Sequence, residues 1–278
     1  PDLTGSFSMS AAENPTVAVM EAGYAASNLD VRYINCEVTP DKLSDAISGA
    51  VAMGWLGFNC SLPHKEKVLQ YLDELAPSAQ LIGAVNTVVI NDGRLMGENT
   101  DGQGFVEALR PLSDPRGARA VIFGAGGAAR AIAIELALAG AQSIMIVNRS
   151  HDKGEKLAEH VDSHTDADCS FSAWTPNFSL PEESTLIVNA TSLGFYPHHE
   201  ETLDVDLTSF RPGSLVADVV ANPPRTQWLQ AAEAAGCSTL TGIGMLVNQA
   251  LVNARLWTGK TLDADVMHTA LTKALRIS

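Results

Sequence analysis

The sequence predicts an α/β fold of two domains, one of which contains a doubly wound parallel sheet. A short apolar run at 120–123 precedes the glycine-rich turn Gly124-Ala125-Gly126-Gly127, and helix-forming residues follow at 128–139. Strand-like runs alternate with helical segments on both sides of this turn. The chain has 278 residues, which is enough for two modest domains.

The glycine turn has the spacing of a dinucleotide-binding motif. It reads G-x-G-x-x-A from Gly124 to Ala129, and Gly140 stands where the following helix should end. Small residues let the backbone approach a pyrophosphate, and the free N–H groups at the helix start receive its charge. The alternative is an ordinary strand-to-helix turn, but the second strand expected at 143–147 favours dinucleotide binding. The predicted contact residues are Gly124, Ala125, Gly126, Gly127 and Ala128.

The first hundred residues indicate an α/β domain with mixed strand directions. A turn at Asn91-Asp92-Gly93 separates two β-rich runs and predicts a hairpin. Pro63 stands where the first turn of a helix tolerates proline. We expect helices at 14–27, 40–53 and 64–75, strands at 31–36 and 55–60, and hairpin strands at 85–90 and 94–96.

The remainder of the chain continues the alternation of helices and strands. A helix at 102–110 leads into a proline-containing boundary at 111–115. Beyond 143–147 we expect a helix near 153–160, strands near 185–189 and 215–219, and helices at 227–235, 245–257 and 263–275. We assign 1–103 plus 240–278 to one domain and 104–239 to the dinucleotide-binding domain.

Composition and charge exclude several classes of partner. The net charge of −14 makes nucleic acid and anionic membranes poor partners, because phosphate binding needs a basic surface. No apolar run is long enough to span a bilayer, and the start at Pro1 lacks a signal-peptide profile. Four scattered cysteines and the loop pair His198-His199 lack metal-ligand spacing, so no metal site is expected. We expect a cytoplasmic monomer or homodimer.

Seven motifs in order resemble those of the shikimate dehydrogenase family. The resemblance implies an N-terminal substrate domain rejoined by the C-terminal helices, and a central NADP domain. It also implies hydride transfer between NADPH and the ring ketone of 3-dehydroshikimate, giving shikimate. The motifs are Asn59-Cys-Ser-Leu-Pro-His-Lys65, Gly83-Ala-Val-Asn-Thr87, Gly97-Glu-Asn-Thr-Asp-Gly102, Gly124-Ala-Gly-Gly-Ala-Ala-Arg130, Asn148-Arg149-Ser150, Asn189-Ala-Thr-Ser192 and Gly242-Ile-Gly-Met-Leu-Val-Asn-Gln249.

The resemblance also implies catalytic and substrate-binding residues. Lys65 and Asp101 match the family's catalytic pair. This agrees with the chemistry, because a lysine assisted by a carboxylate can donate a proton to the alkoxide that forms as a ketone is reduced. Outside these motifs, a lysine at a helix start and an aspartate in a turn would read as surface residues. Ser61, Asn86 and Gln249 are the implied substrate ligands.

The residues after the second strand of the dinucleotide domain favour NADP. A site for NAD usually carries Asp or Glu there to accept the ribose hydroxyls. This chain instead has Asn148, Arg149 and Ser150, with Lys153 nearby, and a guanidinium suits the 2′-phosphate of NADP. We therefore predict NADP, with NAD possible. Ala190, Thr191 and Gly242 complete the implied cofactor contacts.

Two departures from the family pattern fall at the end that binds the substrate carboxylate. The family's S-x-S aligns without gaps with Asn14-Pro15-Thr16, and its upstream Pro and His become Ser10 and Glu13. A shifted frame could instead choose 6–8 or 8–10. The family's carboxylate-binding tyrosine is Ala221. These changes predict weak shikimate binding and a divergent member of the family.

Two other functions stay open at this point. A quinate or quinate/shikimate dehydrogenase using NAD or NADP is the nearest enzymatic alternative. A dinucleotide-binding regulator without catalysis is the alternative from another class. Retention of both Lys65 and Asp101 argues against the regulator, because a sensor has no need of the pair.

Overall fold

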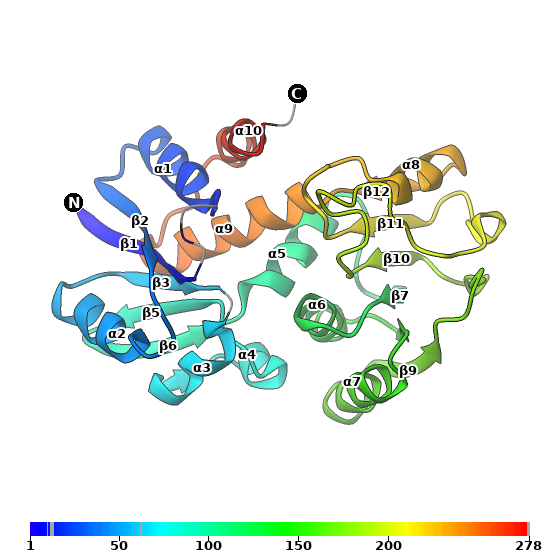
Figure 1. Cartoon of the computed structure of the whole chain (residues 1–278), viewed down its shortest axis with the longest axis horizontal. Coiled ribbons are helices and arrows are strands. Elements are labelled where there is room, and N and C mark those ends of the chain that lie inside the picture. Colours follow the sequence, from blue (N-terminus) through cyan, green and yellow to red (C-terminus); the bar gives the residue numbers. More distant parts are fainter. Residues whose placement is uncertain (10, 12–13, 62, 277–278) are drawn as a thin grey trace. The chain divides into compact units, whose positions relative to one another are not determined.

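The computed structural model describes residues 1–9, 11, 14–61 and 63–276. These fall into two compact units, a first unit of 1–100 with 247–276 and a second unit of 101–246 (Figure 1). Each unit contains a six-stranded sheet with helices, so the predicted α/β class is confirmed. Helix α9 (Gly242–Thr258) begins in the second unit and ends in the first.

The first unit contains the predicted mixed sheet. Its strand order is β2-β1-β3-β5-β6-β4, with β1 parallel to both β2 and β3. The hairpin is confirmed, because β5 and β6 pair antiparallel around Asp92 and Gly93, both at positive φ. The strands are β1 (Asp2–Ser8), β2 (Val31–Glu37), β3 (Gly57–Cys60), β4 (Glu74–Leu75), β5 (Thr87–Asn91) and β6 (Arg94–Glu98).

Helices cover both faces of this sheet. Leu43 of α2 packs with Phe7, Phe58 and Val88 in an apolar cluster on one face. On the other face, α1 lies close to α10, and a Cβ at Gly23 would stand 2.8 Å from a methyl carbon of Leu262. The helices of the unit other than α9 are α1 (Thr16–Ala26), α2 (Leu43–Ala52), α3 (His64–Lys67), α4 (Pro77–Ile82) and α10 (Ala264–Ala274).

The first unit differs from the prediction in β4 and α4, which were not predicted, and in two further features. Strand β1 lies in a polar stretch for which no strand was predicted. The single helix expected at 64–75 is wrong, because α3 ends at Lys67 and a 3₁₀ turn, η2 (Val68–Tyr71), follows. Asp73 then pairs with Leu95, donating its N–H to the carbonyl at 2.9 Å and accepting the Leu95 N–H on its carboxylate at 2.7 Å. Pairing with β6 therefore overrides helix propensity.

The second unit has the predicted doubly wound parallel sheet. Its order is β12-β11-β10-β7-β8-β9, with every pair parallel. The order in which the chain adds strands reverses between β7 and β10, where such sheets bind ligands at the carboxyl ends of the strands. The strands are β7 (Arg119–Phe123), β8 (Ser143–Asn148), β9 (Asp168–Ala173), β10 (Leu186–Asn189), β11 (Leu215–Asp218) and β12 (Ser238–Leu240).

Apolar packing fixes the helices of the second unit. Trp228 of α8 packs with Phe123 and Val216, and Ile132 and Leu136 of α6 are fully buried. Among the described helices, none is long and apolar enough to cross a bilayer. The helices are α5 (Thr100–Leu109), α6 (Gly127–Leu138), α7 (His151–His164), the 3₁₀ turn η3 (Leu207–Ser209) and α8 (Gln227–Ala234).

Substitution of Gly57 by alanine should destabilise the first unit. A Cβ there would overlap the carbonyl oxygen of Val88 and the indole of Trp257, whose Nε1 donates to that carbonyl at 3.0 Å. Overpacking of this kind costs roughly 1–3 kcal/mol. Urea unfolding followed by circular dichroism measures the change.

Gly49→Ala is the matched control. Gly49 lies inside α2, and its new Cβ would meet only a methyl carbon of Met53 at 3.8 Å. The expected change is a gain of roughly 0.5–1 kcal/mol, because alanine suits a helix interior better. Equal effects of the two substitutions would contradict the packing assigned to Gly57.

Candidate functional site

A row of neutral polar side chains crosses the sheet of the first unit. Asn35, Ser6, Asn59 and Thr87 are register partners on four neighbouring strands. The Ser6 hydroxyl donates to Asn35 Oδ1 at 2.7 Å, and Asn59 Nδ2 donates to Thr87 Oγ1 at 2.9 Å. The Tyr33 hydroxyl donates to Asn59 Oδ1 at 2.8 Å. We call the four register partners the polar row.

The polar row is linked to helix α9 through Asn253. The Thr87 hydroxyl donates to Asn253 Oδ1 at 2.8 Å, and the Thr100 hydroxyl donates to the same oxygen at 2.7 Å. Asn253 Nδ2 donates to Gln249 Oε1 at 3.0 Å. Gln249 is thereby fixed on one turn of α9, four residues before Asn253.

Asn86, another predicted substrate ligand, joins the same network. Its Oδ1 accepts the backbone N–H of Thr100 at 2.7 Å, and its Nδ2 donates to the Thr100 hydroxyl at 3.0 Å. Asn86 is 4% exposed and Gln249 is 8% exposed. The structure therefore brings Asn86 and Gln249 into one buried hydrogen-bonded set. Asn253 was not predicted, although its i, i+4 spacing from Gln249 could have indicated it.

Local structure fixes the position of Lys65. The ring of the fully buried His64 contacts the Val38 carbonyl at 2.8 Å, and the Lys65 carbonyl accepts the Val85 N–H at 2.8 Å. Burial raises the pKa of the Cys60 thiol to about 12, and the charge of Lys65 opposes that rise. The Lys65 side chain is half-buried, whereas Ser61 is exposed.

Asp101 is the second residue of α5 and belongs to the second unit, whereas Lys65 belongs to the first. It is half-buried. The two preceding residues are buried and tied down, because Asn99 Nδ2 donates to the Ala84 carbonyl at 3.0 Å and Thr100 bonds to Asn86. These hydrogen bonds fix the two residues that precede Asp101.

Asn14 and Thr16 are the residues predicted at the positions of the family's two serines, and Asn14 is hydrogen-bonded to other side chains. Its Nδ2 donates to Ser6 Oγ at 3.1 Å and to Asn35 Oδ1 at 3.3 Å, while its Oδ1 accepts the Thr16 N–H at 3.0 Å. Asn35 Nδ2 donates to the carbonyls of Ala11 and Asn14. Ser10 and Glu13 lie outside the described residues.

The glycine turn of the second unit fits a dinucleotide. Gly124 has φ +113°, and a Cβ there would stand 2.9 Å from the Ala190 carbonyl oxygen, so β7 and β10 approach closely at the switch point. Added Cβ atoms at Gly126 and Gly127 would meet nothing within 4 Å. Gly126 precedes α6 without a side-chain cap, which leaves N–H groups for an anion.

The other predicted cofactor residues lie at the carboxyl ends of neighbouring strands. Asn148 ends β8, and its Nδ2 donates to the Ser150 carbonyl at 2.8 Å. Thr191 follows β10, where its hydroxyl donates to Asn189 Oδ1 at 2.7 Å. Ser150 precedes α7, Lys153 is exposed in its first turn, and Arg149 is exposed. A Cβ at Gly242 would stand 2.5 Å from the carbonyl oxygens of Val219 and Val220.

A buried carboxylate lies at the ends of β10 and β11. Asp218 accepts Thr226 Oγ1 at 2.6 Å, Asn189 Nδ2 at 3.0 Å and the Val220 N–H at 2.9 Å. Burial raises the pKa of Asp218 to about 6, and these hydrogen bonds oppose the rise. Ala221, which the sequence resemblance predicts at the position of the family tyrosine, follows in the next loop and is buried.

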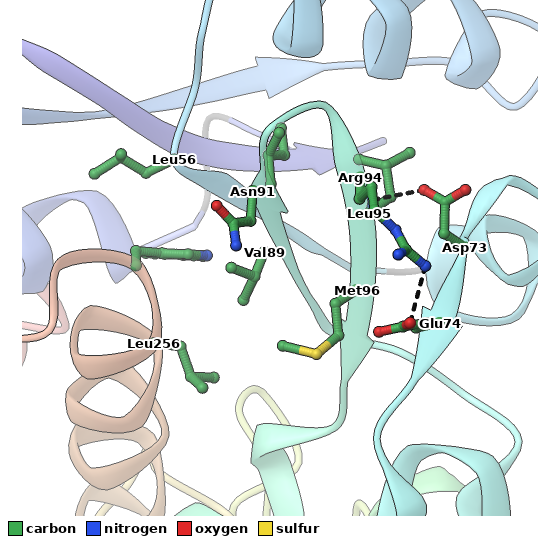
Figure 2. Close-up of a pocket in the computed structure, with 11 residues that line it drawn as sticks. Leu56, Asp73, Glu74, Val89, Asn91, Arg94, Leu95, Met96 and Leu256 are labelled. Carbon is green, nitrogen blue, oxygen red and sulfur yellow. Dashed lines mark hydrogen bonds and ion pairs between the residues drawn. The ribbon is translucent and has the colours of Figure 1, made fainter.

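A separate hollow of about 440 Å³ lies in the first unit beside the β5–β6 hairpin (Figure 2). Arg94 and Glu74 form an ion pair at 2.9 Å on its wall. None of the predicted site residues lines it, so it is not the candidate site. Its lining consists of Leu56, Asp73, Glu74, Val89, Ile90, Asn91, Arg94, Leu95, Met96, Leu256 and Trp257.

Within the described residues, no group of three or more His, Cys, Asp or Glu side chains could bind a metal ion. His198 and His199 lie in an exposed loop, as predicted, each 3.9 Å from Glu200. All four cysteines are free thiols.

Three family models match this chain in order. The shikimate dehydrogenase substrate binding domain matches residues 11–88. The model for shikimate/quinate 5-dehydrogenase matches 107–193, and the C-terminal domain of shikimate 5′-dehydrogenase matches 242–272.

Individual relatives match nearly the whole chain. The shikimate dehydrogenase (NADP(+)) of Desulforamulus reducens is 40% identical over 260 residues, which cover 92% of this chain and 89% of that relative. The ligand-free 5-ketofructose reductase of Gluconobacter sp. strain CHM43 is 52% identical with a TM-score of 0.96, covering 98% of each chain. Shikimate 5-dehydrogenase of Listeria monocytogenes, solved with shikimate and NAD, is 36% identical with a TM-score of 0.91, covering 97% of this chain and 96% of its own.

Thr226→Val should destabilise the protein more at about pH 8 than at about pH 5. The folded pKa of Asp218 lies above its unfolded value, so its stabilising contribution is complete below the unfolded pKa and is lost as pH rises through about 6. Removing the Thr226 hydroxyl takes a hydrogen-bond donor from the Asp218 carboxylate, so the loss of stability at high pH becomes larger. Hydrogen bonds to charged groups contribute roughly 1.5–3 kcal/mol, against about 1 for neutral ones.

Thermal unfolding at both pH values measures this difference. Thr226→Ser keeps the hydroxyl, which also caps α8 by accepting the Leu229 N–H, and should behave like the parent protein at both pH values. A loss of stability in Thr226→Val that is the same at both pH values would contradict the assignment.

Proposed function

We propose a substrate for this chain, which belongs to the shikimate dehydrogenase family and is an NADP-dependent oxidoreductase. The proposed substrate is a neutral polyhydroxylated ketone of the 5-ketofructose class, which NADPH reduces to the alcohol. Relatives of this chain are shikimate dehydrogenases that use NADP. Interconversion of 3-dehydroshikimate and shikimate is therefore consistent with membership of the family. The two kinds of substrate differ in charge, because shikimate and 3-dehydroshikimate carry a carboxylate and a 5-ketofructose-type sugar does not.

One observation carries the preference for a neutral substrate. The donor atoms Ser6 Oγ, Asn14 Nδ2 and Asn35 Nδ2 all donate to protein acceptors. A carboxylate at this end would have to break such a bond or stay unpaired. Burying an unpaired charge costs much more free energy than burying a neutral hydroxyl. Ala221 adds no side-chain donor, so quinate, which also carries a carboxylate, is disfavoured for the same reason.

The comparison with known structures supports the same choice. The 5-ketofructose reductase is 52% identical to this chain, against 36% for the shikimate-bound enzyme of Listeria monocytogenes. A diketo sugar offers hydroxyl groups that both donate and accept. Such groups match Asn86 and Gln249, whose carboxamides also do both.

The proposed chemistry needs a hydride donor and a proton donor. NADPH, when bound, supplies the hydride that adds to the carbonyl carbon. Lys65 gives its proton to the carbonyl oxygen as charge develops there, and Asp101 assists as the carboxylate of the pair. The ketone, NADPH and one proton thus become the alcohol and NADP⁺.

The cofactor residues proposed are the glycine turn and the charged segment after β8. The turn at Gly124–Gly127 has the space and the N–H groups for a pyrophosphate. Arg149 is the proposed ligand of the 2′-phosphate, with Lys153 on the next turn of chain. NAD, which lacks that phosphate, is expected to bind more weakly.

The setting proposed for this reaction is the cytoplasm. Four free thiols suit a reducing compartment, where cysteines remain reduced. The protein is proposed to act as a monomer or homodimer on a small-molecule substrate.

The native protein should reduce 5-ketofructose better than 3-dehydroshikimate. The loss of one hydrogen-bond donor to a charged group costs about 1.5–3 kcal/mol, which corresponds to one to two decades in affinity. We expect kcat/KM with NADPH to be about ten-fold or more higher for 5-ketofructose. The measurement is NADPH consumption at 340 nm with both ketones, each over a full concentration range.

The contribution of the carboxylate end can be tested separately. Ala221→Tyr, alone and combined with Asn14→Ser and Thr16→Ser, should lower the KM for shikimate and leave the KM for NADP⁺ unchanged. Tight shikimate use by the native protein, with no response to these substitutions, would rule out the proposed substrate.

Lys65→Ala and Asp101→Ala should each lower kcat about 10²–10⁴-fold while nearly preserving NADPH binding. Both groups act on proton transfer, so the cofactor site is unaffected. Turnover is measured with the best substrate, and NADPH binding by its fluorescence. Lys67→Ala is the matched control, because Lys67 is an exposed lysine of the same short helix. A variant that turns over at the parent rate would remove that residue from the mechanism.

A further inference from the structure

A pocket of about 280 Å³ lies at the carboxyl end of the second unit's sheet. Arg149 after β8, Trp174 after β9 and Leu193 after β10 contribute to its wall. Strand ends at this edge are where doubly wound sheets bind nucleotides. The remaining lining residues are Thr175, Pro176, Thr202 and Asp204.

The indole of Trp174 is held on several sides. Its Nε1 donates to the Asp204 carbonyl at 3.1 Å, and its backbone N–H donates to the Asn148 carbonyl at 3.1 Å. The ring packs against Phe123 with centroids 5.1 Å apart. The Asp204 carboxylate is itself engaged, accepting the Asn177 N–H at 3.0 Å. Trp174 is thus a fixed surface beside Arg149.

The Arg149 guanidinium lies over that surface. Its Cζ is 5.6 Å from the centroid of the Trp174 ring, within the range of a cation–π interaction. Among the described residues Arg149 makes no ion pair, so its charge is available to an anion. Its side chain is exposed, and an exposed arginine otherwise samples many rotamers.

We propose that Trp174 is a positioning residue that orients Arg149 for the 2′-phosphate and thereby sets the preference for NADP over NAD. The inference rests on the proposed role of Arg149 in NADP binding. A guanidinium already held over the ring loses less conformational freedom when the phosphate binds. NAD has no 2′-phosphate, so the ring should make little difference to its affinity.

Trp174→Leu tests this proposal by separating the two cofactors. The dissociation constant of NADPH, measured by the enhancement of its own fluorescence, should rise about five-fold, and that of NADH should stay within about two-fold. The kcat at saturating NADPH should not change. Trp174→Phe keeps an aromatic face and should recover most of the affinity. Thermal unfolding identifies any variant that has lost its fold.

A double-mutant cycle with Arg149→Ala locates the effect. Arg149→Ala alone should weaken NADPH binding, and adding Trp174→Leu should weaken it no further, because the ring acts through the guanidinium. Equal weakening of NADPH and NADH by Trp174→Leu would overturn the proposal, as would additive losses in the cycle. If Trp174→Leu is unfolded, Trp174→Met and Trp174→Gln, which also lack an aromatic face, give the same comparison.

The outcomes also separate this inference from the proposed function. Unchanged NADPH affinity in Arg149→Ala would remove the proposed 2′-phosphate ligand, and the inference with it. A loss in Arg149→Ala without a loss in Trp174→Leu would overturn the positioning role alone.

Discussion

The carbonyl oxygen of the Asn253 carboxamide accepts two buried hydroxyl groups, and the first unit's candidate site depends on that arrangement. Thr87 and Thr100 donate to it from positions more than 150 residues earlier in the chain. Each donor would cost about 1–3 kcal/mol if it were left unsatisfied. The end of the chain must therefore return to the sheet of the first unit, and this places Gln249 in the same network as Asn86.

The same network explains how the substrate can change while the reaction is kept. Its members on the sheet are neutral, and at the Asn14 end they donate to one another or to backbone carbonyls. Lys65 is positioned separately, through His64 and the Val85 backbone. The contacts that fix the Lys65 backbone thus differ from the side-chain hydrogen bonds that join Asn14 and Asn35. Under the proposed function, substitutions at Asn14, Thr16 and Ala221 change the charge preference and leave the backbone contacts of Lys65 in place.

The sequence predicted the parts whose signals are local. The glycine turn is readable because Gly124 and Gly126 follow the apolar run 120–123, and the hairpin because Asp92 and Gly93 accept positive φ. Strand β1 was missed because its polar residues gain their burial only by pairing with β2 and β3. The 64–75 helix failed for the same reason, since the pairing of Asp73 with Leu95 is not local.

Long-range partners also limited the prediction of the site. Lys65, Asn86 and Gln249 could be named from motifs, but the partners of Asn14 could not, because Asn35 lies on another strand. The stacking of Arg149 on Trp174 was hidden for a similar reason, since 25 positions of chain separate two residues that meet at a sheet edge. Motifs therefore identify which residues act, and the fold determines what each is free to bind.

We expect the end of the site assigned to Asn14, Thr16 and Ala221 to favour a neutral ligand. Isothermal titration of the NADP⁺-saturated protein with shikimate and with its methyl ester tests it most directly, because the two differ chiefly in that charge. We expect the ester to bind at least as tightly as the acid. Binding of the acid about ten-fold or more tightly than the ester would contradict it, since that difference corresponds to about 1.4 kcal/mol in favour of the carboxylate.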